Sequence, residues 1–128
     1  MKVLLDTQAF LWLLSGDSQL SDPARKIFSN PDNEILLSVA SVWEIVVKAQ
    51  RGKLSFPQPA APYIRQQIRK TCIEVLPISL AHVLRVEKLP THHRDPFDRI
   101  LLAQAVEERI PIMSTDRAFQ AYPVEIVW

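Results

Sequence analysis

Acidic side chains recur at places in this sequence where a protein can gather them into a cation-binding site. Asp6 directly follows the first apolar run of the chain, and Asp116 follows a later one. Asp95 and Asp98 open a predicted helix, and Glu44 is expected in the first turn of a helix that follows another apolar run. Open α/β sheets bind their ligands beyond the carboxyl ends of the strands. The pattern therefore predicts that these carboxylates meet at one edge of a sheet.

Carboxylates that share a pocket need a positive charge between them. Two of them ~4 Å apart repel by ~4 kcal/mol at an effective dielectric constant near 20. Glu44 lies in sequence among apolar residues, so its side chain is expected to be buried, where an unpaired charge is costly. Mg²⁺ and Mn²⁺ prefer oxygen ligands and keep several waters, whereas zinc is not expected without histidine or cysteine in the set.

Each acid taken alone also has a structural explanation. Glu44 completes a capping box with Ser41 and can pair with Lys48 one turn later. Asp95 and Asp98 occupy positions that suit the N-cap and the third residue of a helix, and cap is the first choice for Asp95. The remaining acids are equally suited to capping helices. Because a first-turn carboxylate can cap a helix and bind a ligand at once, these explanations do not exclude catalysis.

The elements that would position these acids alternate between short apolar strands and helices, which indicates an α/β fold with a mainly parallel sheet. Strands are predicted over residues 3–5, 34–38, 74–78, 111–114 and 124–127. Helices are predicted over residues 7–15, 21–30, 41–51, 61–71, 79–88 and 95–109, with a short helix from 116. We expect a single domain, residues 1–128.

Composition excludes several classes of protein. The 128 residues are 48% hydrophobic and 23% charged, which is typical of a globular chain. A net charge of +1 excludes a strongly basic nucleic-acid coat, so any contact with nucleic acid must be local. The two glycines cannot form a glycine-rich phosphate loop, and the single cysteine excludes an intramolecular disulfide. No signal peptide or membrane span is predicted, and we expect a soluble, cytoplasmic protein.

Four segments, in order, resemble PIN-domain ribonucleases, and most closely the VapC-like toxins of type II toxin–antitoxin systems: Val3–Trp12, Ser38–Ile45, His93–Ala105 and Ser114–Asp116. The resemblance extends over essentially the whole chain. It implies a three-layer α/β/α sandwich and an acidic, metal-binding active site. It also implies two kinds of protein partner, a small antitoxin that threads along apolar grooves and a second copy of the toxin.

The resemblance assigns the acidic positions of the family to Asp6, Glu44, Asp98 and Asp116. The activity that the resemblance implies is hydrolysis of RNA assisted by Mg²⁺ or Mn²⁺, leaving a 5′-phosphate and a 3′-hydroxyl. Either Glu44 or Asp98 would orient the attacking water or accept its proton. Gln8 departs from the family, because many close relatives carry histidine there, and we assign it no role in proton transfer.

Other polar and aromatic residues near the acids have candidate supporting roles. We expect the hydroxyls of Thr7, Ser38 and Thr115 to steady the carboxylates, although each can equally cap a helix. Arg94, Arg99 and Arg117 are candidates for contacts with RNA phosphates, with solvated or paired charges as the alternative. His92 and His93 are assigned to a polar loop, with phosphate contact as the alternative. Trp12 and Trp43 are assigned to the core or to an interface, with base stacking as the alternative.

Three rival functions fit parts of the same pattern. A phosphotransfer receiver domain needs paired acids after its first strand, whereas Asp6 stands alone. A haloacid-dehalogenase-like phosphatase needs two aspartates one residue apart, and this chain has Asp6-Thr7-Gln8. A catalytically silent PIN-like module that binds RNA or protein is the principal alternative. The complete set of acids favours the nuclease.

Overall fold

A parallel sheet of five strands forms the centre of the computed structural model, which describes residues 1–128, and its strand order is β3-β2-β1-β4-β5. The strands are β1 (Lys2–Leu5), β2 (Glu34–Ser38), β3 (Glu74–Leu76), β4 (Ile112–Met113) and β5 (Ile126–Val127). The helices are α1 (Thr7–Ser15), α2 (Asp22–Ser29), α3 (Val39–Gln50), α4 (Ala60–Thr71), α5 (Leu80–Val86) and α6 (Pro96–Glu108), with a 3-10 helix η1 (Arg117–Ala121). The predicted α/β class with a parallel sheet is confirmed.

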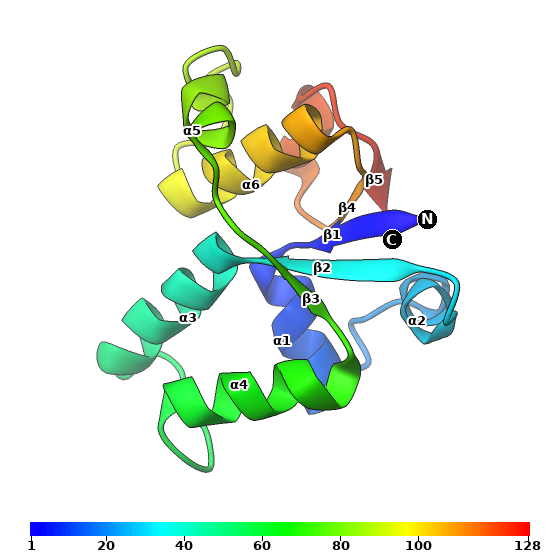
Figure 1. Ribbon diagram of the computed structural model, residues 1–128, viewed down its shortest axis with the longest axis vertical. Coiled ribbons are helices and arrows are strands. Elements are labelled where there is room, and N and C mark those ends of the chain that lie inside the picture. The colour runs from blue at the N-terminus through cyan, green and yellow to red at the C-terminus, as the bar shows by residue number, and fades with distance from the viewer.

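Both faces of the sheet are buried because side chains alternate along each strand. Val3 and Leu5 of β1 point into one core with residues of α1, α2, α3 and α4, while Leu4 points into a second core with residues of α6 and η1. Figure 1 shows α5 and α6 on one side of the sheet and α1, α3 and α4 on the other. This arrangement confirms the three-layer sandwich.

The chain changes direction across the sheet beside β1. It passes from β1 outward through β2 to β3, and then returns to add β4 and β5 on the other side of β1 (Figure 1). A reversal of this kind opens a crevice beyond the carboxyl ends of the two strands that flank it. Here those strands are β1 and β4, and the residues that follow them include Asp6 and Asp116.

The predicted elements are confirmed in order and type, but α3 begins two residues earlier than predicted. The N-cap of α3 is Ser38, whose Oγ accepts a hydrogen bond from the Ala40 N–H at 3.0 Å. The capping box assigned to Ser41 and Glu44 is therefore wrong, and Glu44 lies in the second turn of the helix rather than the first. Trp43 is 61% exposed, so of the two placements predicted for it the core is excluded.

No helix combines the length and apolar character that crossing a bilayer requires.

Candidate active site

Two of the acids are aimed at the crevice by the helix starts that they cap. Asp6 Oδ1 accepts a hydrogen bond from the Ala9 N–H at 2.7 Å at the start of α1. Asp116 Oδ1 accepts one from the Ala118 N–H at 2.9 Å at the start of η1. Because each carboxylate is tied to backbone immediately after its strand, both are fixed at the carboxyl edge of the sheet.

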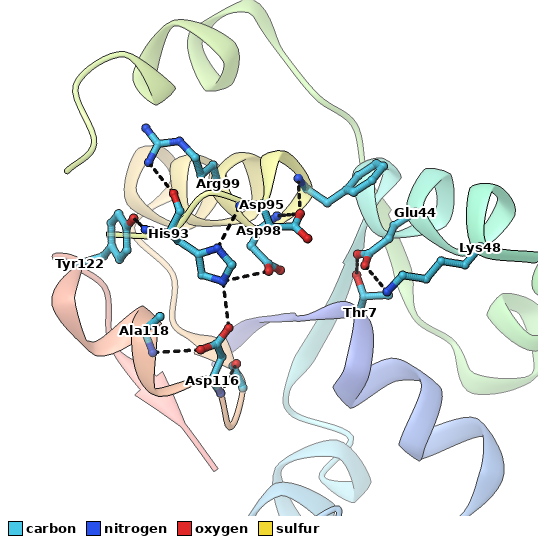
Figure 2. Close-up of polar contacts among 12 residues, drawn as sticks. Thr7, Glu44, Lys48, His93, Asp95, Asp98, Arg99, Asp116, Ala118 and Tyr122 are labelled. Carbon is cyan, nitrogen blue, oxygen red and sulfur yellow. Dashed lines mark hydrogen bonds and ion pairs between the residues drawn. The ribbon is translucent and has the colours of Figure 1, made fainter. Parts of the chain in front are cut away.

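The start of α6 supplies two further acids. Asp95 is its N-cap, and Oδ1 accepts from the N–H groups of Phe97 at 2.8 Å and Asp98 at 3.3 Å. Pro96 follows at the first helical position, where its fixed φ suits a helix start. The cap predicted for Asp95 is confirmed, and it places Asp98 in the first turn of α6, facing Asp116 (Figure 2).

Glu44 approaches the same region from α3 and is only 6% exposed. Its Oε1 accepts a hydrogen bond from Thr7 Oγ1 at 2.7 Å, and its Oε2 lies 2.7 Å from Lys48 Nζ. Figure 2 shows Thr7 and Lys48 converging on this one carboxylate. A buried carboxylate requires such partners, so the predicted Lys48 pair explains how Glu44 is accommodated.

These acids line a single cavity of about 300 Å³ at the end of the sheet. Its ten lining residues are almost all polar: Asp6, Thr7, Gln8, Leu11, Glu44, Lys48, Asp95, Asp98, Thr115 and Asp116. Residues from three helix starts, those of α1, α6 and η1, thus meet residues from the middle of α3, and the acids gather at one edge of the sheet as predicted.

A histidine joins the acids, contrary to the expectation of an all-oxygen set. His93 Nε2 lies 3.1 Å from Asp98 Oδ2 and 3.0 Å from Asp116 Oδ2. One ligand-type atom from each of these three residues lies within 4.8 Å of the other two, a spacing that suits a metal ion. The structure therefore moves His93 from a polar loop into the candidate site.

Comparison with known proteins shows which family the chain belongs to. The sequence model of the PIN domain family matches residues 3–125. The chain belongs to the PIN domain family. Ribonuclease VapC16 of Mycobacterium tuberculosis is 40% identical to it over 58 residues, which are 45% of this chain and 41% of that relative. The match thus covers less than half the length of the relative.

Solved structures confirm the PIN fold over the full length of the chain. VapBC from Salmonella typhimurium, bound to DNA, superposes with a TM-score of 0.75 at 16% identity, covering 99% of this chain and 97% of that one. VapBC2 from Rickettsia felis, bound to a DNA fragment from its promoter, gives 0.73 at 13% identity, covering 100% and 99%. At such identities the likeness shows a shared fold.

Two acids of this PIN domain have raised pKa values, and burial is the main cause of both. Burial raises the pKa of Asp6 to about 6, and the charges of Asp116 and Glu44 add to the rise, while hydrogen bonds from Ser114 and the Ala9 N–H oppose it. Burial also raises the pKa of Asp98 to about 7; the charge of Asp95 adds to this, and His93 opposes it. Both carboxylates therefore hold protons more firmly than free aspartate, and a bound cation would lower both pKa values.

Not every candidate residue of the PIN domain faces this cavity. Arg99 donates to three backbone carbonyls, those of Val86 at 3.1 Å, Pro90 at 2.8 Å and His93 at 3.3 Å. These bonds favour a structural role for its guanidinium, which ties the loop before α6 to that helix. Arg94 and Arg117 are exposed, and both remain predictions as phosphate contacts.

The predicted supporting hydroxyls divide between two roles. Thr7 holds Glu44 and shares a hydrogen bond of 2.9 Å with the Ser41 hydroxyl, so it reaches the site directly. Ser38 is fully buried as the cap of α3, whereas Thr115 is exposed and lines the cavity. Ser114, which the sequence analysis left out, is buried and its Oγ accepts from the Asp116 N–H at 3.0 Å.

Proposed function

We propose that this protein is a metal-dependent endoribonuclease that hydrolyses RNA phosphodiester bonds in the cytoplasm, as the toxin of a toxin–antitoxin pair that inhibits translation. The observation that carries the proposal is the meeting of Asp6, Glu44, Asp98 and Asp116 around one cavity in a PIN domain. The relative named as a ribonuclease supports the reaction, and the structural neighbours named as VapBC complexes support the biological role.

The donor set fits a hard divalent cation. Three carboxylates, from Asp6, Asp98 and Asp116, supply oxygen ligands, and two of them have raised pKa values that a cation would lower. Glu44 is already neutralised by Lys48, so in this arrangement it would act beside the cation rather than as its first ligand. When bound, Mg²⁺ or Mn²⁺ lowers the pKa of a water and neutralises charge that develops on the phosphate.

The side chains of the cavity would share the remaining tasks. His93 takes Oδ2 of Asp98, so Oδ1 would be the oxygen that contacts the cation and orients the attacking water beside it. Lys48 lies on the rim with its side chain 43% exposed, so it can also attract the phosphate of the substrate. Arg94 and Arg117 would bind flanking phosphates, which offsets the repulsion between an acidic cavity and a polyanion.

Divalent-dependent cleavage of single-stranded RNA tests this proposal. The wild-type protein should cut RNA in Mg²⁺ or Mn²⁺ and stop in EDTA, leaving 5′-phosphate ends. Asp6→Asn and Asp98→Asn should each lower the rate by at least about a hundredfold, whereas Asp32→Asn, in an exposed turn, should not change it. A wild-type protein that binds RNA and never cuts it in either metal would establish the silent binding module instead.

The apolar groove next to the active site suits the proposed antitoxin. It has a volume of about 350 Å³ and lies between α1 and residues 54–57, with Trp12, Phe56 and Tyr63 among its walls. Gln8 and Leu11 line both this groove and the acidic cavity, so the two adjoin each other. We propose that an apolar segment of the antitoxin fills the groove and carries a basic side chain to the acids. Phe56 lines the groove and not the acidic cavity, so Phe56→Glu should abolish inhibition by a co-expressed antitoxin while RNA cleavage persists, and unchanged inhibition would exclude this route.

A second exposed apolar surface suits a homodimer. Trp43 of α3 and Val83 of α5 line one apolar depression. Leu80 and Leu84 of α5 are 74% and 58% exposed. We propose that a second copy covers this surface. Sedimentation should give a dimer for the wild type and a monomer for Val83→Arg, and a wild type that is monomeric at all concentrations would exclude the proposal.

A further inference from the structure

His93 connects two acids that come from different parts of the chain. Asp98 lies on α6, and Asp116 follows β4, yet both Oδ2 atoms lie within 3.1 Å of the same histidine nitrogen. Without a group between them, two carboxylates at this spacing repel each other. The contact therefore acts on the relative position of the two acids.

The hydrogen bond at the other ring nitrogen, Nδ1, determines which nitrogen of His93 carries the ring proton. Nδ1 accepts a hydrogen bond from the Asp95 N–H at 3.2 Å, so it carries no proton. The ring proton of a neutral imidazole then resides on Nε2, the nitrogen that faces Asp98 and Asp116. A nitrogen that carries a proton donates hydrogen bonds and has no lone pair for a metal.

Several further contacts hold His93 in place. Its backbone N–H donates to the Tyr122 hydroxyl at 2.7 Å, and its carbonyl accepts from Arg99 at 3.3 Å. The ring centroid lies 5.7 Å from that of Phe119. Figure 2 shows the ring held between Asp95 on one side and the pair of carboxylates on the other. These contacts fix the position of the His93 ring relative to the two carboxylates.

We propose that His93 is a positioning residue: its Nε2–H binds Asp98 and Asp116 together and presents their remaining oxygens to the cation, without itself ligating the metal. The inference rests on the proposed function, since it concerns the same cavity. Hydrogen bonds to metal-binding carboxylates typically change metal affinity or activity by about 10–100-fold. Losing the donor should therefore raise the half-saturating metal concentration by about tenfold or more.

The test compares two substitutions of His93 that differ in their capacity to donate. His93→Gln keeps an amide N–H at a similar reach, whereas His93→Phe keeps a ring and removes the donor. Affinity for Mn²⁺ and for Mg²⁺ is measured by calorimetry and by the metal-induced rise in melting temperature, alongside RNA cleavage. His93→Gln should remain within about threefold of the wild type in metal affinity, and His93→Phe should lose about tenfold or more for both metals. His92→Gln serves as the matched control in the same loop.

A second variant keeps the test valid should His93→Phe fold poorly. Tyr122→Phe removes the hydroxyl that accepts from the His93 backbone and leaves every acid unchanged, so it should weaken metal binding in the same direction and by less. Equal losses in His93→Gln and His93→Phe, larger for Mn²⁺ than for Mg²⁺, would show a metal ligand and overturn the proposal. Metal affinity unchanged in His93→Phe would also overturn it. If the wild type binds metal and cuts no RNA, the proposed function fails while these affinities still decide the role of His93.

Discussion

Replacing Asp6 by asparagine should stabilise the metal-free protein, although it removes a residue of the proposed active site. Asp6 is 7% exposed, and burial raises its pKa from 3.8 to about 6. The unfolded chain therefore releases this proton more readily than the folded one, and the wild type loses stability as the pH rises from about 4 to about 6. At about 1.4 kcal/mol per pH unit, the loss is about 3 kcal/mol. Asparagine has no charge to bury and still accepts from the Ala9 N–H as an N-cap.

Thermal unfolding in EDTA at several pH values measures this effect. At pH 8 Asp6→Asn should melt about 10 °C above the wild type, since about 1 kcal/mol corresponds to about 3–4 °C for a chain of this size. At pH 4 the two proteins should melt at nearly the same temperature. Added Mg²⁺ or Mn²⁺ should raise the wild-type melting temperature and have little effect on the variant. A difference that is the same at pH 4 and pH 8, or a variant less stable at pH 8, would refute the reasoning from burial.

Two further predictions concern the positively charged side chains near the site. Lys48→Met should destabilise the protein by about 1 kcal/mol, because buried Glu44 then keeps only its hydrogen bond from Thr7. Denaturant titration should show this loss when the variant is compared with Lys53→Met, a substitution of an exposed lysine. Equal stability of the two variants would argue against the role of Lys48. Arg99→Ala should lower the free energy of unfolding by about 1–3 kcal/mol and speed hydrogen exchange in residues 87–95. Arg94→Ala, in contrast, should weaken RNA binding alone. Unchanged hydrogen exchange in Arg99→Ala would contradict the structural role of Arg99.

The strand–helix order and the placement of the acids could be predicted because each depends on short-range signals. Asp6 and Asp116 directly follow apolar strands, and in a parallel sheet such positions share one edge. Asp95 and Pro96 mark a helix start by residue type alone. The resemblance to PIN domains then selected these acids from the others in the chain.

The start of α3 could not be predicted from its own residues, because two serines three residues apart can both cap a helix. The pairing of Ser38 with Leu76 of β3 fixes where β2 ends, and the helix follows at once. This register is set by another strand, so local sequence does not contain it.

His93 and Arg99 were assigned other roles because their contacts depend on how the loop before α6 folds. Arg99 reaches back over this loop to Val86, and the loop then brings His93 to Asp116, 23 residues away in sequence. One signal was present in the sequence: His93 lies two residues before a helix N-cap, where a side chain can accept from the backbone of the helix start. That signal does not indicate which side chains the opposite nitrogen will meet.

Locating Mn²⁺ in crystals by anomalous scattering tests the central claim most directly. The account predicts a peak in the cavity between Asp6, Asp98 and Asp116, with Glu44 remaining paired to Lys48. The same experiment on Asp98→Asn should show that peak weakened or lost. Saturating Mn²⁺ with no density at this edge of the sheet, or with the ion bound only elsewhere, would contradict the account.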